Sequence, residues 1–435
     1  MFRTSVTPAG MSRRHFMQHL AGASALALPA INFTNALAAS AAELKKKHKA
    51  CILLWMSGGP STMDIWDLKP GTNTGGKFTP IDTTGDLRIC EHMPLMAQQM
   101  KHVAVVRSMS TREADHNRGR YYMHTGYVPS TTVDHPSYGA VVAHELADQV
   151  PDLQIPPFVS IGGASVGPGF LGMTYAPFVV DTNGDVRNLK FDLDQARLEQ
   201  RLLTLRTIEE NFAKQSRGDE PNDHKKILEK TISLMTSQQM AAFKTDKEPK
   251  EVLERYGVIG APAGRGMGMA NPGFARGCLM ARRLVEEGVS FVEVDFGGWD
   301  NHQNIFTTFE NKLPQLDRPM SALIEDLDQR GMLQDTAIVW MGEFSRTPRI
   351  NGTAGRDHWA RSWSVVVGGA GMKGGQAIGA TNEDGTAVTT EPYTSEDVMA
   401  SVLKALGVSL EKTFTSKNNR PMKIANSGRV IKELF

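Results

Sequence analysis

Short, continuous apolar runs recur along the chain, and each one ends at glycine, proline or a cluster of polar residues. Runs of this kind are typical of buried parallel strands whose carboxyl ends open onto loops. We therefore expect strands at 50–56, 102–107, 289–295, 336–341 and 364–367.

Segments with helical spacing of apolar residues lie between these runs. Helices are expected at 136–146, 275–287 and 316–330. Strands that alternate with helices predict an α/β fold with a doubly wound, mostly parallel sheet. Ligands of such sheets bind beyond the carboxyl ends of the strands. Residues 184–257 are rich in leucine, glutamate, lysine, arginine and glutamine, so we expect two or three helices that form a helical insertion there.

The amino-terminal residues have the pattern of an export signal. Arg13 and Arg14 precede a short apolar stretch, and Ala-Leu-Ala at 36–38 offers a cleavage site. The sequence predicts a twin-arginine signal peptide at 1–38, followed by a single α/β domain at 39–435. Export by the Tat machinery would place the mature chain in the periplasm or outside the cell. No later uncharged run reaches the ~20 residues of a spanning helix, so no stable membrane insertion is expected.

Composition narrows the classes of function. The 435 residues include 48 basic and 47 acidic side chains, for a formal net charge of +1. A nearly neutral chain gives no electrostatic basis for binding nucleic acid. The three cysteines, Cys51, Cys90 and Cys278, form no CxxC pair and are too few for a disulfide framework. We expect buried thiols, although one bridge is allowed.

Polar clusters follow the predicted strands, and the first two differ in character. The first, at 57–67, is a glycine-rich turn with Ser61 and Asp64. The backbone N–H groups of such a turn can bind an anion, although Ser61 equally suits a helix N-cap. The second cluster contains His116 and Arg120. Because imidazole and guanidinium groups are costly to bury without partners, we expect them at a cleft, with a solvated surface as the alternative.

Two further clusters bring carboxylates and imidazoles together. The third, at 295–302, has the carboxylates of Asp295 and Asp300 and the imidazole of His302 around a Gly-Gly turn, and one ion can bind Asp300 and His302 from this loop. The fourth follows the strand at 336–341 and suits either an anion site or a surface loop with ion pairs. Its charged residues include Glu343, Arg346, Asp357 and His358.

The clusters are all expected at one edge of the sheet, where they would form a metal site. A divalent ion such as Zn, Ca, Mn or Mg fits this chemistry, and the inventory suffices for two ions ~4 Å apart or for one. The candidate metal ligands are Asp64, Asp300, His302, Glu343, Asp357 and His358. The candidate catalytic residues are His116 for proton transfer, Ser61 as a nucleophile, and Arg120 and Arg346 for holding a tetrahedral oxyanion.

At these residues the chain resembles the DUF1501 family, exported proteins placed with the alkaline phosphatase and sulfatase superfamily. The resemblance implies an alkaline-phosphatase-like α/β fold with a metal site at the carboxyl ends of the strands. At the end of the first strand the superfamily has a metal-binding carboxylate; here Met56-Ser57-Gly58 stands there, so Asp64 would have to substitute from the following turn. The matching pieces are 58–71, 135–142, 297–302 and 342–359.

Carried over by position, the resemblance implies roles for several residues. His116 stands at the position of the sulfatase nucleophile, and Arg120 where sulfatases keep an arginine. An imidazole can bind a metal or accept a phosphoryl group, but it cannot become formylglycine. Glu343 and His358 match metal-binding positions, whereas Phe344 stands where the superfamily has a ligand.

Three functions are compatible with this sequence. The favoured one is an exported metal-dependent hydrolase of a phosphate or sulfate ester, whose substrate is a small anionic ester or a surface polymer. The alternative is a non-catalytic exported scaffold or binding protein that retains the fold. A third is an enzyme that transfers a group to a surface polymer. A shared fold alone does not choose among them.

Overall fold

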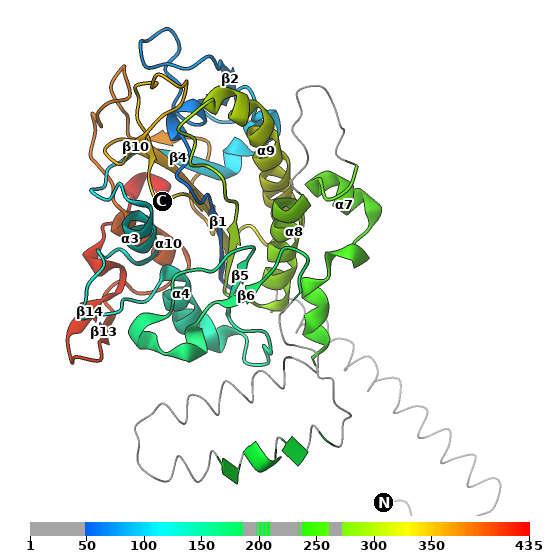
Figure 1. Cartoon of the computed structure of the whole chain (residues 1–435). Coiled ribbons are helices and arrows are strands. Elements are labelled where there is room, and N and C mark those ends of the chain that lie inside the picture. Colours follow the sequence, from blue (N-terminus) through cyan, green and yellow to red (C-terminus); the bar gives the residue numbers. More distant parts are fainter. Residues whose placement is uncertain are drawn as a thin grey trace, which may run out of the picture. The chain divides into compact units, whose positions relative to one another are not determined.

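The apolar runs of the sequence form a central sheet (Figure 1). The computed structural model describes residues 48–185, 237–260 and 272–435, with a few single positions between 197 and 234. The strands are β1 Ala50–Trp55, β2 Pro80–Asp82, β3 Arg88–Cys90, β4 Val103–Met109, β5 Phe158–Ile161, β6 Phe178–Val180, β7 Phe291–Asp295, β8 Thr336–Met341, β9 Ser345–Arg346, β10 His358–Trp359, β11 Trp363–Gly369, β12 Ala377–Ile378, β13 Thr413–Thr415 and β14 Pro421–Lys423.

Helices cover both faces of this sheet. The α-helices are α2 Pro94–Gln99, α3 His116–Thr125, α4 Tyr138–Leu146, α7 Lys250–Tyr256, α8 Pro272–Glu287, α9 Ile305–Gln329 and α10 Ser395–Ala405. The 3-10 helices are η1 Thr62–Asp64, η2 Met100–His102, η3 Ala147–Gln149, η4 Gly169–Leu171, η5 Met173–Tyr175, η6 Gln238–Phe243, η7 Thr245–Lys247, η8 Ile424–Ser427 and η9 Lys432–Leu434.

The sheet confirms the expected doubly wound, mostly parallel α/β fold. The described residues give it eight strands in the order β12-β4-β11-β8-β1-β7-β5-β6. Strand β1 is parallel to both of its neighbours, β7 and β8. Strand β11 is antiparallel to β4 and β8, so it begins at the edge where β1, β7 and β8 end. The loop before β11 therefore reaches the same edge as the loops after the other strands.

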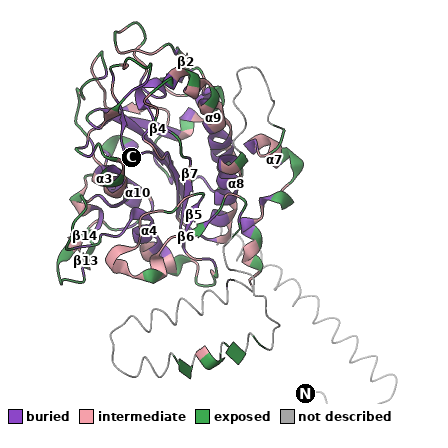
Figure 2. Cartoon of the chain, viewed as in Figure 1, coloured by how far each residue is buried: buried purple, intermediate pink, exposed green. Residues whose placement is uncertain are grey.

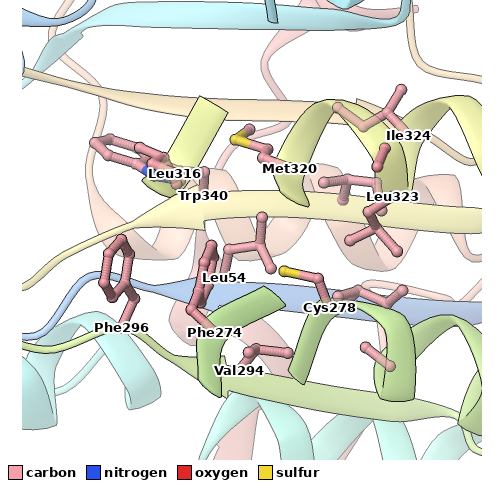
Figure 3. Packing of buried hydrophobic residues seen from close by; sticks show 14 of the residues in the cluster. Leu54, Phe274, Cys278, Val294, Phe296, Leu316, Met320, Leu323, Ile324 and Trp340 are labelled. Atoms are coloured by element: carbon pink, nitrogen blue, oxygen red, sulfur yellow. The ribbon is translucent and has the colours of Figure 1, made fainter. Parts of the chain in front are cut away.

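Alternation along the strands separates two helix-covered layers. Ile52 and Leu54 of β1 face a core formed with α2, α8 and α9, whereas Leu53 and Trp55 face a core formed with α4 and α10. This alternation follows from the two-residue period of a strand. Buried residues fill the sheet and the inward sides of these helices (Figure 2). Figure 3 shows Cys278 of α8 among the buried hydrophobic side chains of this core. All three cysteines are buried and free, as expected.

Several elements differ from the expectation. Helix α9 begins eleven residues before the expected start at 316 and contains Pro314 and Pro319 within it. The signal peptide expected at 1–38 and most of the insertion expected at 184–257 lie outside the described residues. Within the part of the insertion that is described, η6, η7 and α7 are helical. No helix among the described residues combines the length and the apolar character that crossing a membrane requires.

A buried carboxylate joins α9 to α2. Asp317 is 3% exposed, and it accepts hydrogen bonds from the N–H groups of Leu95 at 3.0 Å and Met96 at 2.6 Å. These are donors of the first turn of α2, which has no partner for them within the helix. Burial raises the pKa of Asp317 to about 7, although the two N–H groups oppose this rise. The neutral acid is therefore the form that the fold favours.

Stability should depend on pH through Asp317. Its pKa is raised from 3.8 to about 7 by burial, so between these values the folded protein binds a proton that the unfolded chain releases. The free energy of unfolding contributed by this group is present below pH 3.8 and falls as pH rises toward 7, by at most about 1.4 kcal/mol per pH unit. Urea denaturation of wild type and Asp317→Asn across this range should show wild type losing stability relative to the variant.

Glu310→Gln, on the same helix, is the matched control for this measurement. Its carboxylate pairs with Lys77 near the surface, with 37% of the side chain exposed, so the difference from wild type should change little with pH. If the difference in the free energy of unfolding between wild type and Asp317→Asn did not change over this pH range, the assignment to Asp317 would be contradicted.

Candidate metal centre

Loops from distant parts of the chain meet at one edge of the sheet. Asp300 follows β7, Glu343 follows β8, and His116 begins α3 after β4. His358 is part of β10, which precedes β11, and the reversed direction of β11 brings it to the same edge. The expectation that these side chains converge therefore agrees with the structure.

Three of them form a close group. Within the described part of the chain, one ligand atom each from His116, Asp300 and His358 lies within 4.8 Å of the others. His116 Nε2 is 3.3 Å from Asp300 Oδ2, and His358 Nε2 is 3.5 Å from Asp300 Oδ1. Two imidazoles and a carboxylate are ligand types that Zn²⁺, Mn²⁺ and Fe²⁺ accept.

His358 is held with a free lone pair directed at this group. Its Nδ1 lies 2.8 Å from the carbonyl oxygen of Ala114, which can only accept, so the proton is on Nδ1. Its Nε2 is buried and has no hydrogen bond within the described part of the chain. Burial lowers the pKa of His358, which favours the neutral ring. A neutral imidazole with an outer hydrogen bond from Nδ1 is the form that binds metal ions.

His116 is oriented in the same way by Glu343. Its Nδ1 is 2.6 Å from Glu343 Oε1, which also accepts the N–H of Gly58 at 3.0 Å. The hydrogen bond to Glu343 raises the pKa of His116. Residue 119 of α3 is a glycine, and a Cβ there would lie only 3.2 Å from the Cβ of Glu343. The absence of this Cβ lets α3 approach the segment that follows β8 so closely.

Three buried polar atoms of His116, His358 and Glu343 form no hydrogen bond within the described residues. Among the described residues, the Nε2 atoms of His116 and His358 and the Oε2 atom of Glu343 are buried without a hydrogen bond. Leaving a buried polar atom unsatisfied costs about 1–3 kcal/mol. All three are potential electron-pair donors, and a cation bound by the two imidazole nitrogens together with Asp300 would satisfy both rings, so the residues present fit a divalent metal ion.

Asp300 carries the negative charge of the group. Burial opposes its ionisation, but Arg346 and the nearby imidazoles outweigh burial and lower the pKa of Asp300. Arg346 Nη2 is 2.6 Å from Asp300 Oδ1. Arg346 is itself 1% exposed, and its Nε donates to the carbonyl oxygen of Gly59 at 2.7 Å. The expected arginine therefore lies at the site and also fixes the turn after β1.

Phe344 packs against both imidazoles and offers no ligand atom. Its ring centroid is 5.0 Å from that of His116 and 4.7 Å from that of His358. The residue is fully buried. At this position an apolar ring replaces a ligand and fixes the orientation of two others.

His302 and Asp357 form the open rim of the group. His302 Nε2 is 2.9 Å from Asp300 Oδ1, and its Nδ1 is 2.7 Å from Asp357 Oδ1. The hydrogen bond to His302 lowers the pKa of Asp357. More than half of the Asp357 side chain is exposed. The structure thus brings both residues to the site, with the Asp357 carboxylate hydrogen-bonded to the outer nitrogen of His302.

The family model for "Protein of unknown function (DUF1501)" matches residues 48–435. The chain belongs to the DUF1501 family. No curated protein matches its sequence.

Solved structures similar to this DUF1501 protein include sulfatases and phosphatase-like proteins. PsFucS1 sulfatase from Pseudoalteromonas sp. is 13% identical with a TM-score of 0.39, over 83% of this chain and 68% of that one. The lipoteichoic acid synthase LtaP from Listeria monocytogenes is 8% identical with a TM-score of 0.35, over 84% and 72%. A protein in the alkaline phosphatase superfamily from Vibrio parahaemolyticus is 11% identical with a TM-score of 0.35, over 88% and 69%. The sequence identities and TM-scores are low, so these structures do not identify the reaction of this DUF1501 protein.

Two expected site residues of the DUF1501 chain lie in a separate buried network. Both carboxylate oxygens of Asp64 accept from Arg356, at 2.8 and 2.9 Å, and the Ser61 hydroxyl donates to Asp64 Oδ2 at 2.6 Å. Ser61 and Arg356 are fully buried. The expected roles need correction here: Asp64 is committed to a guanidinium, and Ser61 cannot meet a substrate from this position.

Arg120 lies beside the metal group and not within it. Its guanidinium donates to the carbonyl oxygen of Ala164, and its Nε is buried without a hydrogen bond among the described residues. Its charge favours the ionised forms of Glu293 and Asp295. Arg120 is thus placed to face an anion from the side of β7.

Ser57 and Asp295 lie in two of the polar clusters of the sequence but were not expected to act in the site. The Ser57 Oγ lies 2.7 and 2.6 Å from the two carboxylate oxygens of Asp295. The signal that could have found them is the pairing of parallel strands, because Trp55 of β1 is in register with Asp295 of β7. A hydroxyl two residues beyond Trp55 then reaches the carboxylate.

Removing one member of the buried pair of Asp64 and Arg356 should strongly destabilise the fold. In Asp64→Asn, the guanidinium of Arg356 stays buried without its counter-charge, so the free energy of unfolding should fall by about 3–5 kcal/mol. Urea denaturation of the purified variant measures this loss. Asp82→Asn is the matched control, because its partner Arg88 and Asp82 itself are largely exposed, and the loss should stay below about 1 kcal/mol. Equal losses in the two variants would contradict the assignment.

Proposed function

We propose that this DUF1501 protein is a metal-dependent hydrolase acting on a phosphate or sulfate ester. The observation that carries the proposal is the convergence of three donor atoms, from His116, Asp300 and His358, within 4.8 Å. The loose similarity to sulfatases and phosphatases agrees with this function but does not establish it. The substrate would be a small anionic ester or an ester group on a surface polymer.

Different residues of the site would bind the metal ion, bind the anionic substrate and transfer a proton in such a reaction. A divalent ion held by His116, Asp300 and His358 would supply a Lewis acid for charge that develops on an ester oxygen. Arg346 provides a fixed positive charge beside Asp300 for the anionic substrate. His302, on the exposed rim and bonded to Asp357, can transfer a proton to or from a leaving group.

The donor set narrows the choice of ion. Two imidazole nitrogens favour Zn²⁺ or Mn²⁺ over Ca²⁺ and Mg²⁺, which prefer oxygen ligands. Glu343 provides a buried oxygen without a hydrogen bond nearby. We therefore propose zinc or manganese as the native ion.

Metal titration tests this proposal directly. Isothermal titration calorimetry of metal-free protein should show stoichiometric binding of Zn²⁺ or Mn²⁺. Loss of an outer hydrogen-bond partner weakens metal sites by about 10–100-fold, so loss of a ligand in His358→Ala or Asp300→Ala should weaken binding by more than about 100-fold. Wild type should hydrolyse p-nitrophenyl phosphate or p-nitrophenyl sulfate, and chelation should abolish the activity.

His144→Ala is the matched control, because this imidazole pairs with Glu145 on α4 and is not part of the metal group. It should bind the ion like wild type. Wild-type protein that binds no stoichiometric ion would exclude the hydrolase and favour the non-catalytic binding protein, since Phe344 already replaces one expected ligand.

We also propose that the chain is exported through the Tat pathway to the periplasm or the cell exterior. The support is in the sequence, in the paired arginines Arg13 and Arg14 before a short apolar stretch. Replacing both arginines by lysine in the full-length chain should leave the uncleaved precursor in the cytoplasm, as detected by immunoblotting of cell fractions. Unchanged export of this variant would contradict the proposal. As a control, the reverse replacement of Lys45 and Lys46 by arginine should leave export unchanged.

A further inference from the structure

A second chemical pair lies at the same edge of the sheet as the metal group. The Ser57 hydroxyl follows β1, and the Asp295 carboxylate ends β7, its parallel neighbour. The hydroxyl oxygen is within 2.7 Å of both carboxylate oxygens. Ser57 is the sole hydrogen-bond donor that the described residues give to this carboxylate. The geometry is that of a nucleophile and the base that removes its proton.

The Asp295 carboxylate has no positively charged partner among the described residues that would hold it in a structural ion pair. Neighbouring Glu293 is fully buried and is paired with His124 at 3.2 Å and with the hydroxyl of Ser165. Among the described residues, no lysine, arginine or histidine side chain lies within ion-pair distance of the Asp295 carboxylate. Burial, together with the charges of Glu293 and Glu343, raises the pKa of Asp295, which makes it a stronger base than an exposed aspartate.

Two glycines lie next to the pair. A Cβ at Gly163 would lie 2.9 Å from Asp295 Oδ2, so that position admits no side chain without a shift. A Cβ at Gly297 would stand 3.7 Å from Asp295 Oδ1 and 3.8 Å from Ser57 Oγ, and Gly297 is exposed. Both members of the pair are partly accessible. A small ester can therefore approach the hydroxyl, in contrast to the buried hydroxyl of Ser61.

The pair is tied directly to the metal group. The next residue after Ser57, Gly58, donates its N–H to Glu343 Oε1, the atom that also orients His116. Gly58 has φ of +110°, and a Cβ there would lie 2.6 Å from the backbone nitrogen of Asp300. Ser57 is thus held against the segment that carries Asp300, and an ester bound at the metal group would lie beside its hydroxyl.

We propose that Ser57 is the nucleophile of this protein and that Asp295 is its general base, in a phosphoryl-transfer reaction that passes through phosphoserine. This inference rests on the proposed metal-dependent hydrolase and identifies phosphate esters as its substrate class. It assigns the nucleophile to the end of β1, and His116 remains a metal ligand.

The two half-reactions balance. Ser57 Oγ forms a bond to phosphorus while the bond from phosphorus to the alcohol oxygen breaks, and Asp295 takes the hydroxyl proton and passes it to the departing alcohol. Water then attacks the phosphoserine, Asp295 takes a proton from that water, and the phosphorus–Ser57 bond breaks. The proton returns to the Ser57 oxygen and inorganic phosphate is released. Arg120, whose Nε has no hydrogen bond within the described part of the chain and whose charge acts on Asp295, is placed to hold the phosphoryl oxygens.

Trapping the intermediate tests this inference. Metal-loaded wild type turning over p-nitrophenyl phosphate is quenched in acid, which preserves phosphoserine, and its peptides are analysed by mass spectrometry. The peptide with Ser57 should carry one phosphoryl group. Ser57→Ala should lose both this label and turnover, and Asp295→Asn should lower kcat by about 10²–10⁴-fold. Both variants should still bind the metal ion like wild type, which a collapse of the site would not allow.

Ser165→Ala is the matched control, since it removes another hydroxyl bonded to a carboxylate of β7. It should keep the label on Ser57. Turnover by Ser57→Ala near the wild-type rate, or a label on His116 that survives alkali and not acid, would overturn this inference and leave the hydrolase standing. Wild type that neither binds a metal ion nor turns over the phosphate ester would overturn both.

Discussion

The buried ion pair between Asp64 and Arg356 is the interaction on which the site depends. Arg356 lies two residues before His358, and its backbone N–H donates to the carbonyl oxygen of Asn301, beside Asp300. Its side chain holds Asp64 in the turn after β1. The backbone and the guanidinium of this one arginine thus connect the loops that follow β1, β7 and β8. A pair this deeply buried costs desolvation energy, so its contribution is the fixed relative position of these loops more than net stability.

The carboxylates at this edge differ in how their charge is balanced, and that difference divides them into structural and reactive groups. Asp64 is neutralised by Arg356, and Glu293 by His124. Glu343 orients His116 with one oxygen and keeps the other without a hydrogen bond, whereas Asp295 meets only a serine hydroxyl among the described residues. Unbalanced carboxylates this close together are unfavourable unless a cation or a proton joins them. The electrostatics therefore favour a cation beside Asp300.

The sequence predicted the fold more completely than the site. Continuous apolar runs indicate buried parallel strands, and the expected strands at 289–295 and 336–341 correspond closely to β7 and β8. The helix α3 was not expected from periodicity, because its polar residues face the site and their pattern is set by chemistry rather than by burial. Asp64 was assigned to the site because sequence shows the order of charges but not their partners. Its guanidinium partner lies almost 300 residues away, and a local pattern contains no sign of it.

Phe344 and Ser57, two residues at the same edge of the sheet, have a joint consequence for the charges there. Phe344 contributes no ligand atom, and the hydroxyl of Ser57 donates to Asp295 and so lowers the repulsion that a second carboxylate at that position would create. A centre with two ions needs ligands on both sides, and here the remaining imidazoles gather on one side, around Asp300. One cation flanked by a hydroxyl–carboxylate pair is therefore the arrangement that the charges of this chain support.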